Sequence, residues 1–200
     1  MIEAVIFDWF GVCAEKWIDV WQRSLKGRVN PERLRDDFFK NLDAYATSAI
    51  TGEVFLGRVL GEQILNPGQH RELLTNVGAI NFELLERIRG LKEGTRTALL
   101  SDNFTEIAPV IDQRIGGFAN YFDVTILSNE LGIGKKGPKI YQATLDRLGV
   151  PASEAVFIDD KQKNLDVARS LGIDTIQYAF TNGQGNEQLY TALRERGVEI

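Results

Sequence analysis

The chain has 200 residues, a hydrophobic fraction of 44% and a formal net charge of −5 at pH 7. This composition is typical of a globular protein and excludes a disordered chain, and the negative charge disfavours nonspecific nucleic-acid binding. No apolar run approaches the length of a membrane span, and the amino terminus lacks the charged and apolar regions of a secretion signal. The single cysteine cannot form an internal disulfide, which fits a reducing compartment. We therefore expect a soluble, cytoplasmic protein that binds neither nucleic acid nor membrane.

The first strand is expected over Ala4–Phe7, an unbroken apolar run that ends directly at Asp8. Such a run is typical of a strand buried on both faces of a parallel sheet. Open α/β sheets bind ligands at the carboxyl ends of their strands, so Asp8 is a candidate reactive or metal-binding group. Gly11 would let the chain turn sharply and bring backbone amides close to a bound anion. Taken alone, an aspartate at such a place more commonly ends the strand and caps the next turn.

Residues 14 to about 92 show helical patterns and no convincing strand. Asn30-Pro31-Glu32 predicts a helix start, because it combines an N-cap residue with a proline and an acid in the first turn. The apolar residues that follow recur at helical spacing: Leu34, Phe38, Phe39 and Leu42. A second run repeats apolar residues in the same way: Val54, Phe55, Val59, Leu60, Ile64 and Leu65. It ends at the helix breaker Asn66-Pro67-Gly68, and a third helix is expected over Phe82–Leu91.

From residue 97 onward the pattern alternates between short apolar strands and amphipathic helices. Further strands are expected over four segments: 97–101, 122–127, Ala155–Asp159 and 173–178. Helices are expected over 138–148, 162–171 and 187–196. This alternation predicts a parallel sheet with right-handed crossovers and helices on both faces, which is a doubly wound, Rossmann-like α/β fold.

The helical block interrupts the chain between the first and second strands. We therefore expect an α-helical cap, residues 14–80, inserted beside the carboxyl ends of the strands of an α/β core, residues 1–13 and 81–200. Trp17 and Trp21 are spaced i, i+4 on the first helix of this block. Packing between cap and sheet is the expected use of both rings, and a wall for the substrate is the alternative.

Polar residues follow the carboxyl ends of the predicted strands in four groups: Asp8; Ser101 with Asp102 and Asn103; Lys135; and Asp159 with Asp160. These groups suit phosphoryl transfer, in which a carboxylate attacks phosphorus while a hydroxyl and a lysine hold the phosphate oxygens. A second carboxylate would help to hold Mg²⁺. Lys161 and Lys163 make the predicted mouth of the site more positive than the chain as a whole, which would attract anions.

Several of these residues also have a purely structural interpretation. Asp159 and Asp160 could cap the helix that follows, but adjacent buried carboxylates repel each other and favour a nearby cation. Ser101 could be an ordinary strand-end hydroxyl, and Lys135 could belong to a solvated basic face. Cys13 has no neighbouring histidine and is expected to pack in the core rather than to act as a nucleophile.

In these motifs the sequence resembles the haloacid dehalogenase superfamily over essentially its whole length. The family's first motif, a hydrophobic strand followed by Asp-x-Asp-Gly-Val/Thr, is similar to Phe7-Asp8-Trp9-Phe10-Gly11-Val12. The second, a strand ending in Ser or Thr, matches Leu99-Leu100-Ser101-Asp102-Asn103. The third, a lysine ahead of a Pro-x-Ile-Tyr helix, matches Lys135-Lys136-Gly137-Pro138-Lys139-Ile140-Tyr141, and the fourth, an acidic pair after a strand, matches Phe157-Ile158-Asp159-Asp160. The helical block resembles the small cap of subfamily I.

The resemblance implies a hydrolase and gives roles to the matching residues. Asp8 would be the nucleophile that becomes an aspartyl-phosphate, and Ser101 would bond a phosphoryl oxygen. Lys135 would neutralise the phosphate and the nucleophile before attack. Ser101, Asp102, Asn103 and Lys135 would bind the substrate, a small phosphorylated metabolite.

The resemblance also implies a Mg²⁺ site. Its ligands would be Asp8, the backbone carbonyl of Phe10 and Asp160, with Asp159 as a second ligand or as a partner of the ligands. Phe10 departs from the family pattern, because it stands where the usual second aspartate acts as general acid and base. A positioned acid or base is typically worth about two to four orders of magnitude in rate.

This departure leaves three hypotheses. The first is a Mg²⁺-dependent phosphatase. The second is a catalytically weakened member that binds Mg²⁺ and phosphate-like anions in a regulatory or interaction role. The third is a metal-independent haloacid dehalogenase, since those enzymes carry an aromatic residue at the position of Phe10. The pair Asp159-Asp160 disfavours the third hypothesis, because the dehalogenases lack it.

Overall fold

The computed structural model describes residues 1–61, 66–91, 94–182 and 184–200. Within these residues the chain forms a five-stranded sheet with the strand order β3-β2-β1-β4-β5. The strands are β1 (Ala4–Phe7), β2 (Arg96–Ser101), β3 (Val124–Leu127), β4 (Ala155–Asp159) and β5 (Asp174–Gln177). Every pair of neighbouring strands is parallel. The predicted doubly wound α/β sheet is confirmed.

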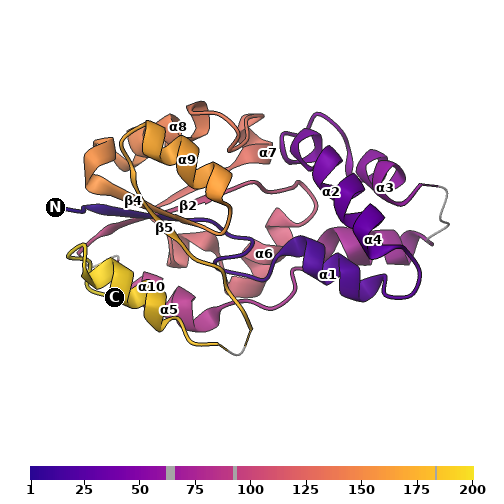
Figure 1. Cartoon of the computed structure of the whole chain (residues 1–200), viewed down its shortest axis with the longest axis horizontal. Coiled ribbons are helices and arrows are strands. Elements are labelled where there is room, and N and C mark those ends of the chain that lie inside the picture. The colour runs from indigo at the N-terminus through magenta and orange to yellow at the C-terminus, as the bar shows by residue number, and fades with distance from the viewer. Residues whose placement is uncertain (62–65, 92–93, 183) are drawn as a thin grey trace.

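Alternate residues of the strands pack on opposite faces of the sheet. Val5 and Phe7 belong to one hydrophobic cluster, together with α5 (Phe82–Leu91), α6 (Ala108–Ile115) and α10 (Glu187–Arg194). Ala4 and Ile6 belong to a second cluster, together with α8 (Lys139–Leu148) and α9 (Gln162–Ser170). Helices therefore cover both faces of the sheet (Figure 1), and the central strand β1 is fully buried, as its unbroken apolar run predicted.

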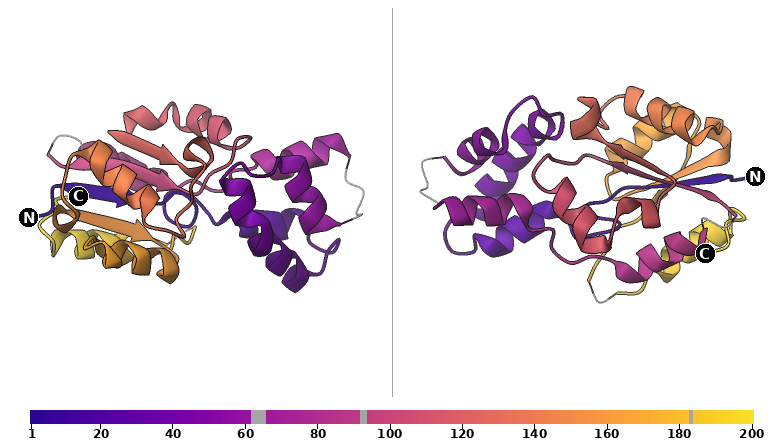
Figure 2. Two further views of the ribbon diagram at one scale, coloured as in Figure 1. Left: turned by 90° about the horizontal axis from the view of Figure 1, so that it is seen from above. Right: turned by 180° about the vertical axis from the view of Figure 1, so that it is seen from behind.

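Four helices lie together beyond the carboxyl ends of the strands (Figures 1 and 2): α1 (Trp17–Ser24), α2 (Pro31–Ala46), α3 (Gly52–Leu60) and α4 (Pro67–Thr75). The start of α2 is the predicted one, since the side chain of Asn30 accepts a hydrogen bond from the Arg33 amide at 2.9 Å. Ile64 and Leu65 of the second predicted run lie outside the described residues. The division into a core, 1–13 and 81–200, and a cap, 14–80, stays a prediction.

Aromatic rings join helices α1 and α2 to the loop that follows β2. The ring centroid of Trp17 in α1 lies 4.5 Å from that of Phe104, and Tyr45 in α2 stacks on the same ring at 4.6 Å. The Tyr45 hydroxyl also donates a hydrogen bond to Glu106, which accepts a second one from the Gly52 amide. Trp21 is fully buried, and its indole donates to the Leu73 carbonyl at 2.9 Å. Trp21 thus packs among the helices α1–α4, and Trp17 packs between these helices and the loop that follows β2.

Some elements differ from the sequence-based expectation. Helix α6, the short helix α7 (Ser128–Leu131) and two 3₁₀ turns, Phe118–Asn120 and Ala152–Glu154, were not predicted. Strand β3 starts two residues later than expected, because the Asp123 carboxylate accepts hydrogen bonds from the amide and hydroxyl of Thr97. None of the helices in the described part of the chain has the length and apolar character that a membrane span requires.

Candidate active site

At the carboxyl ends of β1 and β4, the carboxylates of Asp8 and Asp159 both contact the buried side chain of Lys135. The ammonium nitrogen of Lys135 lies 2.7 Å from Asp8 Oδ1 and 2.8 Å from Asp159 Oδ2. All three side chains are almost completely buried. Residues that are far apart in the sequence thus form a compact cluster, as the strand-end argument predicted, while their catalytic roles stay predictions.

Lys135 remains charged in this buried position. Burial alone would lower its pKa, but the carboxylates of Asp159 and Asp8 outweigh burial and raise it above the usual value. Its ammonium also lies over the ring of Phe157, 5.7 Å from the centroid. The Tyr141 hydroxyl holds the backbone here by donating to the Lys135 carbonyl at 3.1 Å.

The two carboxylates that contact Lys135 differ in their surroundings. Asp159 accepts hydrogen bonds from the Lys161 amide at 2.7 Å and from Asn164 Nδ2 at 2.9 Å, in addition to Lys135. Burial raises the pKa of Asp159, but Lys135 and these donors more than offset burial and leave it below the usual value. Asp8 accepts a hydrogen bond from the Trp9 amide at 2.7 Å. Burial outweighs the opposing effect of Lys135 there, so the pKa of Asp8 is raised above its usual value. The charged form of Asp159 is therefore the better stabilised of the two, and Asp8 is the more basic carboxylate.

Asp160 completes a group of three carboxylates that suits a divalent cation. One oxygen each from Asp8, Asp159 and Asp160 lies within 4.8 Å of the others. Oδ2 of Asp160 pairs with the Lys16 ammonium at 2.8 Å, while its Oδ1 is buried without a hydrogen-bond partner. A buried polar atom that lacks a partner is costly unless an ion or water satisfies it, and carboxylate oxygens are the ligands that Mg²⁺ prefers. The donor set therefore fits Mg²⁺.

Gly11 is required by the position of Asp160. A Cβ atom on Gly11 would lie 2.6 Å from Asp160 Cγ, and its φ of +96° is a conformation that other residues rarely adopt. The Gly11 amide itself donates to the Ala14 carbonyl at 2.7 Å, so it does not face an anion. Gly11 thus makes the sharp turn that the sequence predicted and leaves room for the Asp160 carboxylate, while anion binding by neighbouring amides stays a prediction.

A further group of predicted site residues lies at the carboxyl end of β2. Asp102 Oδ1 accepts a hydrogen bond from the Lys135 amide at 3.0 Å, and Asp102 lines the pocket described below. Ser101 is fully buried and its hydroxyl donates to the Asp102 carbonyl at 3.3 Å. Asn103 is also buried; its amide donates to Ser128 Oγ at 3.0 Å, and its own Nδ2 has no hydrogen-bond partner. Of these predicted substrate-binding residues, only Asp102 lines that pocket.

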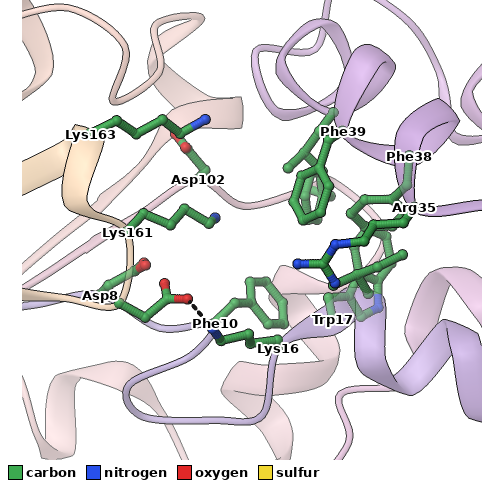
Figure 3. Close-up of a pocket in the computed structure, with 14 residues that line it drawn as sticks. Asp8, Phe10, Lys16, Trp17, Arg35, Phe38, Phe39, Asp102, Lys161 and Lys163 are labelled. Carbon is green, nitrogen blue, oxygen red and sulfur yellow. Dashed lines mark ion pairs between the residues drawn. The ribbon is translucent and has the colours of Figure 1, made fainter. Parts of the chain in front are cut away.

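A pocket of about 260 Å³ opens between the sheet and helices α1 and α2 (Figure 3). Its charged lining residues are Asp8, Asp102 and Asp160 with the cations Lys16, Arg35, Lys161 and Lys163. Its apolar lining residues are Phe10, Trp17, Ile18, Phe38, Phe39, Leu42 and Phe104. Sequence reasoning missed Lys16 and Arg35 as site residues. Both lie in the helical block, and no sequence motif indicated which helical face meets the sheet.

Cys13 is fully buried, and burial raises its pKa well above the usual value, with the nearby Asp8 carboxylate acting in the same direction. A protonated, inaccessible thiol is a poor nucleophile. The position in the core agrees with the sequence-based expectation for this residue.

The family model of the haloacid dehalogenase-like hydrolases matches residues 2–172. The chain belongs to this family. Over 161 residues it is 30% identical to Acyl-CoA dehydrogenase family member 10 of Mus musculus, a match that covers 78% of the chain but 13% of that protein. Over 189 residues it is 25% identical to the D-ribitol-5-phosphate phosphatase of Bacteroides thetaiotaomicron, covering 88% of the chain and 92% of that enzyme. The chain thus spans a small part of the mouse relative and nearly the full length of the bacterial one.

Solved structures agree on the fold. A haloacid dehalogenase family enzyme from Bacteroides thetaiotaomicron, crystallised with magnesium and inorganic phosphate, superposes with a TM-score of 0.72 at 23% identity. The match covers 95% of this chain and all of the other. The chain therefore shares its fold with that enzyme.

Proposed function

We propose that this hydrolase is a Mg²⁺-dependent phosphatase that acts on a small phosphomonoester through an aspartyl-phosphate on Asp8. The observation that carries the proposal is the contact of the buried Lys135 with both Asp159 and Asp8, because Asp8 itself lines a pocket rich in cations. A buried nucleophile held by an ammonium, beside groups that attract phosphate oxygens, suits phosphoryl transfer. Phosphatases among the curated relatives support the same reaction.

The residues of the site divide the work of this reaction. The Asp8 carboxylate attacks phosphorus, the bond between phosphorus and the ester oxygen breaks, and that oxygen leaves with the bonding electrons and takes a proton from water. A water molecule then attacks the phosphorus of the aspartyl-phosphate, which releases inorganic phosphate and restores the Asp8 carboxylate. Lys135 and the Trp9 amide orient Asp8 for this attack. Lys161 lines the pocket on the same side, where its positive charge favours the phosphate oxygens. Ser101 is proposed to bond a phosphoryl oxygen, which requires its hydroxyl to turn from the Asp102 carbonyl.

The Mg²⁺ ligands proposed are Asp8, Asp160 and the backbone carbonyl of Phe10. The unpartnered oxygen of Asp160 supports this assignment. Asp159 already accepts hydrogen bonds from a lysine, an amide and an asparagine, which favours a role in positioning Lys135 over direct ligation. When bound, the metal supplies positive charge that offsets the repulsion between Asp8 and the phosphate.

Phe10 limits the rate that this arrangement supports. Its ring packs against Trp17 and Phe104, with centroids 6.0 Å and 6.2 Å apart, and offers no proton donor to the leaving oxygen. The second candidate function, a weakened member that binds Mg²⁺ and phosphate-like anions in a regulatory or interaction role, is favoured by this ring. Metal-independent dehalogenation is disfavoured, because Asp159 and Asp160 both lie at the site.

The test is phosphate release from a panel of phosphomonoesters with Mg²⁺ or with a chelator. We expect release that requires Mg²⁺ and is abolished by Asp8→Asn, whereas Asp166→Asn, an exposed aspartate that pairs with Arg169 on α9, behaves as wild type. Mg²⁺ binding by calorimetry should weaken in Asp160→Asn. Metal binding without turnover supports the second candidate. Halide release in chelator, or phosphate release that survives Asp8→Asn, would overturn the proposal.

A further inference from the structure

The walls of the pocket divide into a charged side and a largely apolar side (Figure 3). Asp8, Asp102 and Lys161 lie just beyond the ends of strands, and Lys163 lies in the first turn of α9. Helices α1 and α2 contribute mainly apolar side chains to the facing wall: Trp17, Ile18, Phe38, Phe39 and Leu42. A phosphate bound at the charged side, as the proposed function requires, would leave the organic part of the substrate against the apolar side.

The neutral side chains that line this pocket in the described part of the chain have no free hydrogen-bonding group, because the one polar group among them, the Trp17 indole N–H, donates to the Asn76 carbonyl at 3.2 Å. Among its lining residues in the described part of the chain there is no serine, threonine, asparagine, glutamine, tyrosine or histidine. A polyhydroxylated organic group would place its hydroxyls against aromatic rings, where they lose hydrogen bonds to water without gaining new ones. The pocket therefore disfavours sugar and polyol phosphates and favours an apolar group.

The apolar surface is rigid and built largely of rings. Phe10 and Trp17 are stacked with an interplanar angle of 26°, and Trp17 stacks on Phe104 at the same angle. Trp17 is 3% exposed and Phe10 is 8% exposed, so these rings are fixed by their neighbours. Fixed rings bind flat organic groups by stacking without a large cost for ordering the site.

Arg35 supplies a second charge at the apolar side. Its guanidinium lies over the ring of Phe39, 5.2 Å from the centroid, and points into the pocket toward the side that carries Asp8 and Lys161 (Figure 3). No carboxylate in the described part of the chain lies within ion-pair distance of it. A guanidinium stacked on a ring keeps its donors available for a carboxylate or a phosphate.

We propose that the substrate is a phosphomonoester with a flat, apolar organic part that ends in a second anionic group. The proposal rests on the phosphatase function proposed above. The phosphate binds beside Asp8 and Lys161, the organic part packs on the ring of Phe10, and the second anionic group pairs with the guanidinium of Arg35. The volume of about 260 Å³ suits a single ring.

The test compares kcat/KM for three substrates with alkyl leaving oxygens: benzyl phosphate, 4-carboxybenzyl phosphate and ribitol 5-phosphate. We expect 4-carboxybenzyl phosphate to be preferred over benzyl phosphate by about tenfold, the effect of one charged hydrogen bond at a partly exposed site. Both should be preferred over ribitol 5-phosphate. Arg35→Gln should remove the preference for the carboxylate through KM. Arg33→Gln is the matched control, because Arg33 lies on the same helix but pairs with Asp37 outside the pocket.

The outcomes separate this inference from the phosphatase function. Equal or better turnover of ribitol 5-phosphate, or an unchanged carboxylate preference in Arg35→Gln, overturns the inference and leaves the phosphatase standing. If no phosphomonoester is hydrolysed, the phosphatase proposal fails. Calorimetry with the two benzyl phosphates then decides the ligand class: tighter binding of the carboxylate that Arg35→Gln removes supports it, and equal binding overturns it.

Discussion

Phe10 is the residue whose replacement is expected to raise the rate. Its side chain lines the pocket together with Asp8, at the position where the family usually carries an acid. Phe10→Asp places a proton donor and acceptor there, and we expect kcat for phosphate release to rise by about two orders of magnitude. The variant should also be less stable, because it loses the packing of the ring against Trp17 and Phe104. Steady-state kinetics and urea unfolding measure the two effects.

Phe10→Asn is the matched control for this change. It has nearly the shape of the aspartate variant and loses the same ring contacts, but it cannot transfer a proton. The two variants should therefore unfold at similar urea concentrations and differ in kcat. Equal rates in both would show that the missing carboxylate is not what limits turnover.

Site residues were predictable from the sequence where a strand end or a motif marked them. Asp8 and Asp159 lie at the ends of buried strands, and Lys135 is the lysine of a family motif. The structure brings the three side chains together. Arg35 was not predictable, because its place in the pocket depends on how α2 is turned relative to the sheet. The reason for Gly11 was also hidden, since only the fold brings Asp160 against its Cα.

At the scale of elements, helix α2 carries much of the apolar wall, and its start depends on one side chain. Asn30 accepts a hydrogen bond from the Arg33 amide and leaves Pro31 as the first helical residue. We expect Asn30→Ala to lower the free energy of unfolding by about 1 kcal/mol, because a backbone donor loses its partner. Asn30→Asp should keep the cap and most of the stability. Urea unfolding is the measurement, and equal loss in both variants would contradict a capping role.

The strands and most helices could be predicted because each carries its own pattern, an apolar run or apolar residues at helical spacing. Helix α6 was missed, since no side-chain cap marks its start. The late start of β3 depends on hydrogen bonds between Asp123 and Thr97, which belong to different segments. Local patterns predict where elements occur, while contacts between elements set their exact ends.

At the scale of the whole molecule, the docking of helices α1–α4 on the sheet determines the pocket. Besides the aromatic stack, Ser128, the first residue of α7, donates to the Ala46 carbonyl at 2.6 Å and accepts from the Asn103 amide. Lys136 pairs with Asp43 at 3.1 Å across the same junction. The sequence predicted a helical block in this position of the chain, but its docking arises from contacts between residues that no local pattern links.

The molecule as a whole should lose stability at high pH. Burial raises the pKa of Tyr178 to about 12 and that of Tyr190 to about 12, from the usual value of about 10. Between pH 10 and 12 the unfolded chain therefore loses protons that the folded chain keeps, so the free energy of unfolding falls as pH rises. The raised pKa of Lys135 acts in the same direction. Below pH 10 these groups contribute no such slope.

Replacing both tyrosines by phenylalanine separates their titration from that of other groups in this pH range. Tyr178 donates a hydrogen bond to the buried Asn186, and Tyr190 donates to Glu83 at 3.2 Å, so each Tyr→Phe change lowers stability at pH 8. The double variant should nevertheless lose less stability than wild type between pH 10 and 12, because phenylalanine has no hydroxyl group to ionise in the unfolded chain. Urea unfolding at several pH values measures both slopes. A wild-type stability that stays constant up to pH 12, or equal slopes in the two proteins, would contradict the burial of these phenols.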